Sequence, residues 1–98
     1  MGYKLKSITK SPMEGKKLRA TFVDSETGRE KHTDFGATGY DDFTKTKNLT
    51  QRNAYRIRHS KDLNTSDPTR AGFLSYYILW NKPTISASIA DYRHRFNM

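Results

Sequence analysis

Residues 69–80 read TRAGFLSYYILW, and this stretch decides the fold of the chain. At about 100° per residue, Phe73, Tyr77 and Trp80 form one of two apolar rows, so the segment predicts a helix that is apolar around most of its circumference. Residues 66–68, Ser-Asp-Pro, are typical of a helix start, because an oxygen side chain caps free N–H groups and proline suits the first turn. A helix of this kind has to be covered by the rest of the protein.

A three-stranded antiparallel sheet is expected before this helix. Tyr3 and Leu5 alternate with lysines, and residues 18–23 alternate in the same period of two, which a half-buried strand requires. Residues 11–15 (SPMEG) and 24–28 (DSETG) have the proline and glycine content of hairpin turns. We therefore predict an α+β fold: an N-terminal meander over residues 1–35, followed by about three helices packed on it over residues 36–98.

The helix before the core helix is expected over residues 48–60. Its arginines Arg52 and Arg56 fall on one side, opposite Ala54 and Ile57. The sequence therefore predicts an amphipathic helix with a cationic outer face.

A last helix is expected after Pro83, with Thr84 as its cap. Apolar side chains recur behind this cap at spacings of four, three and four, which predicts a single buried stripe. The stripe consists of Ile85, Ile89, Tyr92 and Phe96.

Length and composition limit the class of protein. A chain of 98 residues is expected to form one domain, and its twelve per cent of aromatic residues favours a folded chain. The longest apolar run, Phe73 to Trp80, is far below the roughly 20 residues of a membrane span. We expect no secretory signal in Met1 to Lys10, and the absence of cysteine excludes disulfides and thiolate chemistry.

Charge points to a polyanionic partner. Eighteen Lys and Arg residues against ten Asp and Glu give a net charge of +8, and residues 43–61, called here the basic segment, contain six cations and no acid. A second cationic cluster lies near the C-terminus, where it also suits the helix dipole. No groove-reading motif is present, so we predict phosphate contacts without strong sequence specificity. The candidate nucleic-acid-binding residues are Lys45, Lys47, Arg52, Arg56, Arg58, His59, Arg93 and Arg95.

The aromatic residues allow two interpretations. Tyr76 and Trp80 are candidate contacts with a partner protein, and Tyr40, Phe43 and Tyr55 are further rings that could stack on bases. Core filling is the alternative, because a small domain needs several large buried side chains.

The sequence gives little support for a catalytic function. The only local acid cluster is Asp34, Asp41 and Asp42, and such carboxylates commonly cap helices or pair with lysines. The three histidines are far apart in the sequence, and no nucleophile elbow is present. We predict a protein that is not an enzyme and that uses no metal, cofactor or small-molecule substrate.

Six motifs of the sequence form a recognisable pattern: DFG (34–36), YDDFT (40–44), RNAYRIRH (52–59), DPTRAG (67–72), YILWNKPT (77–84) and IADY (89–92). With these motifs, residues 33–96 resemble a family of small basic proteins of unknown function encoded by large double-stranded DNA viruses of algae and amoebae. The resemblance implies a viral protein located in the virion or in the host-cell interior, either the cytoplasmic virus factory or the nucleus, and it implies no activity.

Two functional hypotheses follow. The first is a virion- or genome-associated protein that binds nucleic-acid phosphates. The second is a minor capsid or cement protein whose basic and aromatic surfaces bind acidic shell proteins, with oligomer formation as one route to assembly. If the basic segment and the C-terminal arginines share one side of the fold, a continuous phosphate track is favoured; if they lie opposite, bridging is favoured.

Overall fold

The computed structural model describes residues 2–98 and confirms the predicted α+β fold. The strands β1 (Tyr3–Lys10), β2 (Lys16–Asp24) and β3 (Glu30–Ala37) form one antiparallel sheet in the order β1-β2-β3. Both hairpin turns lie where the sequence predicted them, and each places a glycine at positive φ: Gly15 at 85° and Gly28 at 76°. The sheet is therefore a meander with two short connections.

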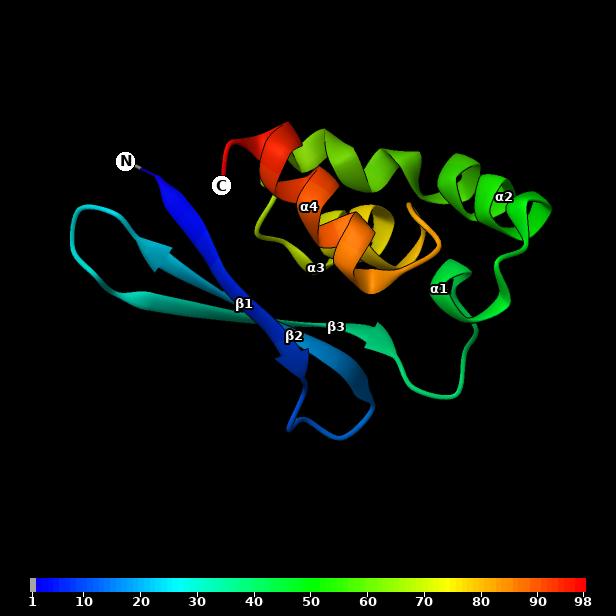
Figure 1. Cartoon of the computed structure of the whole chain (residues 1–98), viewed down its shortest axis with the longest axis horizontal. Helices are drawn as coiled ribbons and strands as arrows, with labels where there is room; N and C mark the ends of the chain where they lie inside the picture. The colour runs from blue at the N-terminus through cyan, green and yellow to red at the C-terminus, as the bar shows by residue number, and fades with distance from the viewer. Residues whose placement is uncertain (1) are drawn as a thin grey trace.

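The helical part forms a second layer on one face of the sheet, as Figure 1 shows. No helix among residues 2–98 is long and apolar enough to cross a membrane. The elements are α1 (Phe43–Thr46), α2 (Leu49–His59), the 3-10 helix η1 (Ser60–Thr65), α3 (Ala71–Leu74), the π-helical turn η2 (Ser75–Leu79) and α4 (Ile85–Phe96).

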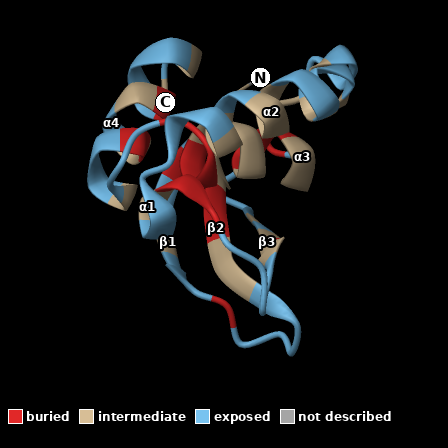
Figure 2. Cartoon of the chain, turned by 90° about the vertical axis from the view of Figure 1, so that its right-hand side faces the viewer, coloured by how far each residue is buried: buried red, intermediate tan, exposed pale blue. Residues whose placement is uncertain are grey.

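The core lies between the two layers, where Figure 2 shows the buried residues gathered. The sheet contributes alternating side chains: Leu5 pairs in register with Phe22, and Phe35 of β3 is fully buried. From the helical layer, Leu74, Ile78 and other large side chains pack against them. The period-two pattern of the sequence thus identified the buried face of the sheet.

Helix α4 has the predicted cap and the predicted stripe. The Thr84 side chain accepts a hydrogen bond from the N–H of Ala87 at 3.2 Å, which satisfies one of the free donors of the first turn. Tyr92 is fully buried, and its hydroxyl donates to the carbonyl of Pro68 at 2.6 Å. The remaining members of the stripe, Ile85, Ile89 and Phe96, pack against the same core.

The core helix differs from the prediction at both ends. The Asp67 side chain accepts hydrogen bonds from the N–H and hydroxyl of Thr69, which closes a separate turn, and Arg70 is extended, so α3 begins only at Ala71. From Ser75 the helix widens into the π-helical turn η2, in which the N–H of Trp80 bonds to the carbonyl of Ser75 at 3.1 Å. Such turns are rare and occur frequently at functional sites.

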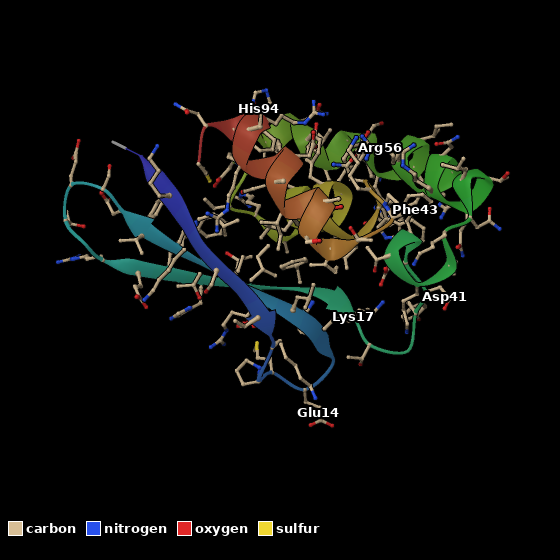
Figure 3. All side chains as sticks on the ribbon, in the orientation of Figure 1. Glu14, Lys17, Asp41, Phe43, Arg56 and His94 are labelled. Atoms are coloured by element: carbon tan, nitrogen blue, oxygen red, sulfur yellow. The ribbon has the colours of Figure 1, made fainter. Side chains whose placement is uncertain are left out.

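The orientation of α2 is the largest correction. We predicted that Ile57 faces the core and that Arg52 and Arg56 face solvent. Instead Ile57 is 77% exposed, and both arginines point into the helical layer and bond to carbonyl groups there. Figure 3 shows Arg56 between α2 and the rest of that layer. The physical reason is that carbonyl groups at the end of the core helix accept hydrogen bonds from these two arginines.

Candidate functional site

Two arginines of α2, Arg52 and Arg56, bind the C-terminal end of the core helix. Arg52 Nε donates to the carbonyl of Asn81 at 2.9 Å, and Arg56 Nη1 donates to those of Trp80 at 2.8 Å and Tyr76 at 3.3 Å. The last carbonyl groups of a helix have no hydrogen-bond partner within the helix, and they carry partial negative charge. A guanidinium group supplies both the missing N–H donors and a compensating positive charge. Both residues therefore have a structural role, beside any contact with a partner.

The Arg56 guanidinium also lies on aromatic rings. It is 4.0 Å from the ring centre of Tyr76 and 5.7 Å from that of Tyr77, and Arg95 of α4 approaches Tyr77 at 5.1 Å. Burial lowers the pKa of Arg56, although a guanidinium remains charged throughout the physiological range. Tyr76, a predicted partner contact, is therefore used within the molecule.

Three rings form a stack between α2 and η2. The ring of Tyr55 lies 4.4 Å from that of Trp80, tilted by 9°, and 4.1 Å from that of His59, tilted by 20°. Burial raises the pKa of the Tyr55 hydroxyl, which lies beside Ser75. Trp80, the second predicted partner contact, is 8% exposed and thus belongs mainly to the core.

A cavity of about 590 Å³ opens beside this stack, between α2, η2 and the loop that follows β3. Its volume lies in the range of about 300 to 1,000 Å³ that small-molecule sites occupy. Rings form part of its wall, and polar and charged side chains form the rest. The residues that line the cavity include Tyr40, Asp41, Gln51, Tyr55, Arg58, His59, Ser75 and Trp80.

Gly36 shapes the floor of the cavity. Its φ of 80° favours glycine, and a Cβ atom at this position would lie 2.7 Å from Cδ1 of Leu79. The close approach of β3 to η2 therefore depends on the absence of a side chain.

The acidic residues that the sequence grouped are separated in the structure. Asp34 accepts hydrogen bonds from Arg19 at 2.9 and 3.1 Å, whereas Asp42 caps α1 and binds Lys17 at 2.7 Å. Among residues 2–98, no three side chains of the metal-binding types come together. Asp41 makes no hydrogen bond or ion pair with the described part of the chain and lines the cavity.

The carboxylates of Asp34 and Asp42, which are both hydrogen-bonded to cations, predict that the fold loses stability in acid. Hydrogen bonds from Arg19 lower the pKa of Asp34; burial opposes ionisation of Asp42, but hydrogen bonds from Lys17 and Thr44 outweigh it and lower the pKa of Asp42 as well. A carboxyl group with a lowered pKa stabilises the fold above its unfolded-state pKa and loses that contribution as the pH falls. Urea unfolding should therefore show constant stability at neutral pH and a decline below about pH 5.

A double variant, Asp34→Asn with Asp42→Asn, provides the control for this acid dependence. The variant should be less stable at neutral pH and should show a flatter decline in acid, because asparagine does not titrate and still caps a helix. An identical slope in the variant and the natural protein would contradict this assignment.

The exposed cations of the basic segment have no acidic partner. The side chains of Lys45, Arg58 and Lys61 make no hydrogen bond or ion pair with residues 2–98, and the side chain of Lys47 bonds only to the carbonyl of Thr44, at 2.8 Å. We call Lys45, Lys47, Arg58 and Lys61 the outer cations. Their charge is available to an external anion.

The C-terminal cations lie on α4, which belongs to the same helical layer as α2 (Figure 1). Arg93 approaches the carbonyl of Lys6 at 3.5 Å, His94 points outward in Figure 3, and Arg95 forms an ion pair with Asp91 at 3.4 Å. Contact of Arg56 and Arg95 with one ring, Tyr77, links this cluster to α2. A phosphate track that joins the two cationic clusters stays a prediction.

The structure thus divides the predicted site residues into groups. Arg58, His59 and Trp80 meet at the cavity, whereas Arg52, Arg56 and Tyr76 make contacts within the fold. Sequence reasoning missed Gln51 and Ser75 and considered Asp41 only for a metal site. The apolar rows of residues 73–80 do not specify the π-helical turn that places Ser75 in the cavity wall.

The fold and the site together define a small basic α+β protein. It has a cavity partly lined by aromatic side chains, and cations without an acidic partner among residues 2–98 lie beside this cavity. Residues 6–59 match the model described as "Family of unknown function (DUF5754)", and the chain belongs to that family. The matched region contains the sheet from Lys6 onward, α1 and α2, and therefore the outer cations other than Lys61. No curated protein and no solved structure matches the chain significantly.

Proposed function

We propose that this protein binds nucleic acid through the phosphate backbone, without chemistry of its own. The observation that supports the proposal best is the set of outer cations, which no acid within the described residues neutralises. Phosphate contacts of this kind supply affinity and carry no sequence information. The net charge of +8 adds long-range attraction for any polyanion.

The outer cations predict both affinity and its dependence on salt. If four to six phosphates are neutralised, the log–log slope of affinity against salt should be about −4 to −5 on duplex DNA. Changing Lys45, Lys47 and Lys61 to glutamine should weaken binding at least about tenfold and reduce the slope by about 2 to 3. Fluorescence anisotropy with labelled DNA between about 50 and 300 mM salt measures both quantities.

A matched control removes the same charge from the hairpin ends. Lys10, Lys16 and Arg29 are exposed, and their side chains make no hydrogen bond or ion pair with the described residues. Changing all three to glutamine lowers the net charge by the same three units, from +8 to +5. If both triple variants lose affinity equally, the charge acts only as a general surface property and the proposed interface is wrong.

A second candidate function, binding to an acidic shell protein, has one observation in its favour. Leu49 and Ile57 are 60% and 77% exposed on the outer side of α2, next to the outer cations. An apolar stripe with cations beside it suits an acidic amphipathic partner. Retained assembly after nuclease treatment, together with loss of assembly in Ile57→Asp, would favour this candidate.

The resemblance to viral proteins bears on the choice of polyanion. If the chain is virus-encoded, we expect the genome or its transcripts to be the bound nucleic acid. Detection of the protein in purified particles, crosslinked to nucleic acid, would support this extension, whereas its exclusion from particles would restrict the protein to the infected cell.

A further inference from the structure

We propose that the cavity beside Tyr55 takes one unpaired nucleobase of a single strand while the outer cations hold the adjoining phosphates. This inference rests on the proposed function and specifies the form of nucleic acid. It goes beyond phosphate binding because a base inside a duplex is stacked and paired, and therefore does not reach a cavity.

The cavity wall favours a planar aromatic group. Tyr40 is 72% exposed and lines one side, and the stack of Trp80, Tyr55 and His59 lines another. Because Trp80 and His59 cover both faces of Tyr55, the exposed Tyr40 ring provides the face on which a base can stack. Single-stranded nucleic acids bind proteins by stacking successive bases on such rings, while cations follow the backbone. A core-filling role does not account for Tyr40, because most of its surface is in contact with solvent.

The charges around the cavity favour a neutral group inside and a phosphate at its rim. Lys17 is neutralised by Asp42 at 2.7 Å and His59 faces Asp62 at 3.1 Å, while Asp41 adds an unpaired negative charge. An anion deep in the cavity would be repelled by Asp41. Arg58 makes no ion pair with residues 2–98 and belongs both to the wall and to the outer cations, so it marks the point where a strand would enter.

Hydrogen-bonding groups are available for the edge of a base. Gln51 accepts from the Thr46 hydroxyl at 3.0 Å and keeps its amide N–H donors unused, and the Asp41 carboxylate is a free acceptor. Together they offer donor and acceptor positions to a heterocycle with an exocyclic amino group, such as adenine or cytosine. Ser75 at the π-helical turn adds a hydroxyl group to the same wall.

The only tryptophan of the chain provides a direct readout. Trp80 lines the cavity, so a base that enters should change its fluorescence, whereas duplex bound along the outer cations should not. The probes are single-stranded DNA of about 20 nucleotides, the same sequence as a duplex, and adenosine monophosphate. Anisotropy reports binding, and Trp80 emission reports occupation of the cavity.

The test variant is Tyr40→Ala, with Tyr40→Trp as the conservative change and Ile57→Ala as a matched loss of exposed apolar surface outside the cavity. We expect the natural protein to bind the single strand more tightly than the duplex, with a change in Trp80 emission. Tyr40→Ala should weaken single-strand binding at least about fivefold and leave duplex binding unchanged. Tyr40→Trp, read by anisotropy, and Ile57→Ala should bind as the natural protein does.

The experiment distinguishes a failure of the base-binding cavity from a failure of the proposed function. Equal binding of duplex and single strand with unchanged Trp80 emission would overturn the base-binding cavity and leave the proposed function intact. An absence of binding to either form would overturn both. Adenosine monophosphate that binds as tightly as the strand would replace the inference with a free-nucleotide site.

Discussion

Replacing Tyr92 with alanine is expected to lower the free energy of unfolding by about 3 to 5 kcal/mol, the range for truncating a large buried aromatic side chain. Tyr92 is fully buried in α4, 4.9 Å from the ring of Phe96, and its hydroxyl bonds to the carbonyl of Pro68 at 2.6 Å. The side chain therefore joins the last helix to the turn before α3. Chemical unfolding in urea, followed by circular dichroism, gives the change directly.

Tyr92→Phe keeps this prediction testable if the alanine variant does not fold. Phenylalanine fills the same space but leaves the Pro68 carbonyl without its donor, which should cost about 1 to 3 kcal/mol. Burial raises the pKa of the Tyr92 hydroxyl, so it remains a donor throughout the neutral range. A phenylalanine variant as unstable as the alanine variant would show that the hydrogen bond, and not packing, dominates.

Replacing Arg56 with alanine is expected to lower the free energy of unfolding by about 2 to 4 kcal/mol, a large effect for a residue that is only partly buried. The variant loses charge-assisted hydrogen bonds to the carbonyl groups of Tyr76 and Trp80 and the contact with the Tyr76 ring, and it leaves those carbonyls unsatisfied. Thermal unfolding should show a lower melting temperature by roughly 8 °C or more.

Arg58→Ala is the matched control, because it removes the same side chain from the same helix two residues away. The Arg58 side chain makes no hydrogen bond or ion pair with residues 2–98, so its loss should change stability by less than about 0.5 kcal/mol. The effects on nucleic-acid affinity should be reversed. Arg58→Ala should bind more weakly than the natural protein, whereas Arg56→Ala, under conditions in which it is folded, should bind almost as well. Unchanged stability in Arg56→Ala would refute the structural role assigned to this arginine.

The contrast between these arginines changes how the interface has to be tested. A double charge reversal at Arg52 and Arg56 would disturb the packing of α2 on η2 as well as any phosphate contact. Loss of binding in such a variant would not distinguish unfolding from a lost interface. Changes at Lys45, Lys47 and Lys61 avoid this ambiguity because all three side chains are exposed.

Part of the candidate site could be predicted from the sequence. The cationic character of residues 43–61 and the presence of Tyr40 and Tyr55 as stacking candidates follow from the residues themselves. Their convergence with Ser75 on one cavity does not, because these groups come from distant parts of the chain. The π-helical turn that presents Ser75 depends on local backbone geometry, which a pattern of apolar rows does not specify.

The sequence by itself determined the sheet, its turns and the last helix. Strand alternation, glycines at the hairpins and the Thr84 cap are local signals, and tertiary contacts reinforced each of them. Only the tertiary structure decided the orientation of α2. Hydrophobicity placed Ile57 inside, but the carbonyl groups at the end of the core helix required donors, and Arg52 and Arg56 supplied them. Unsatisfied buried carbonyls cost more than one exposed isoleucine, and their position is known only once the helices are packed.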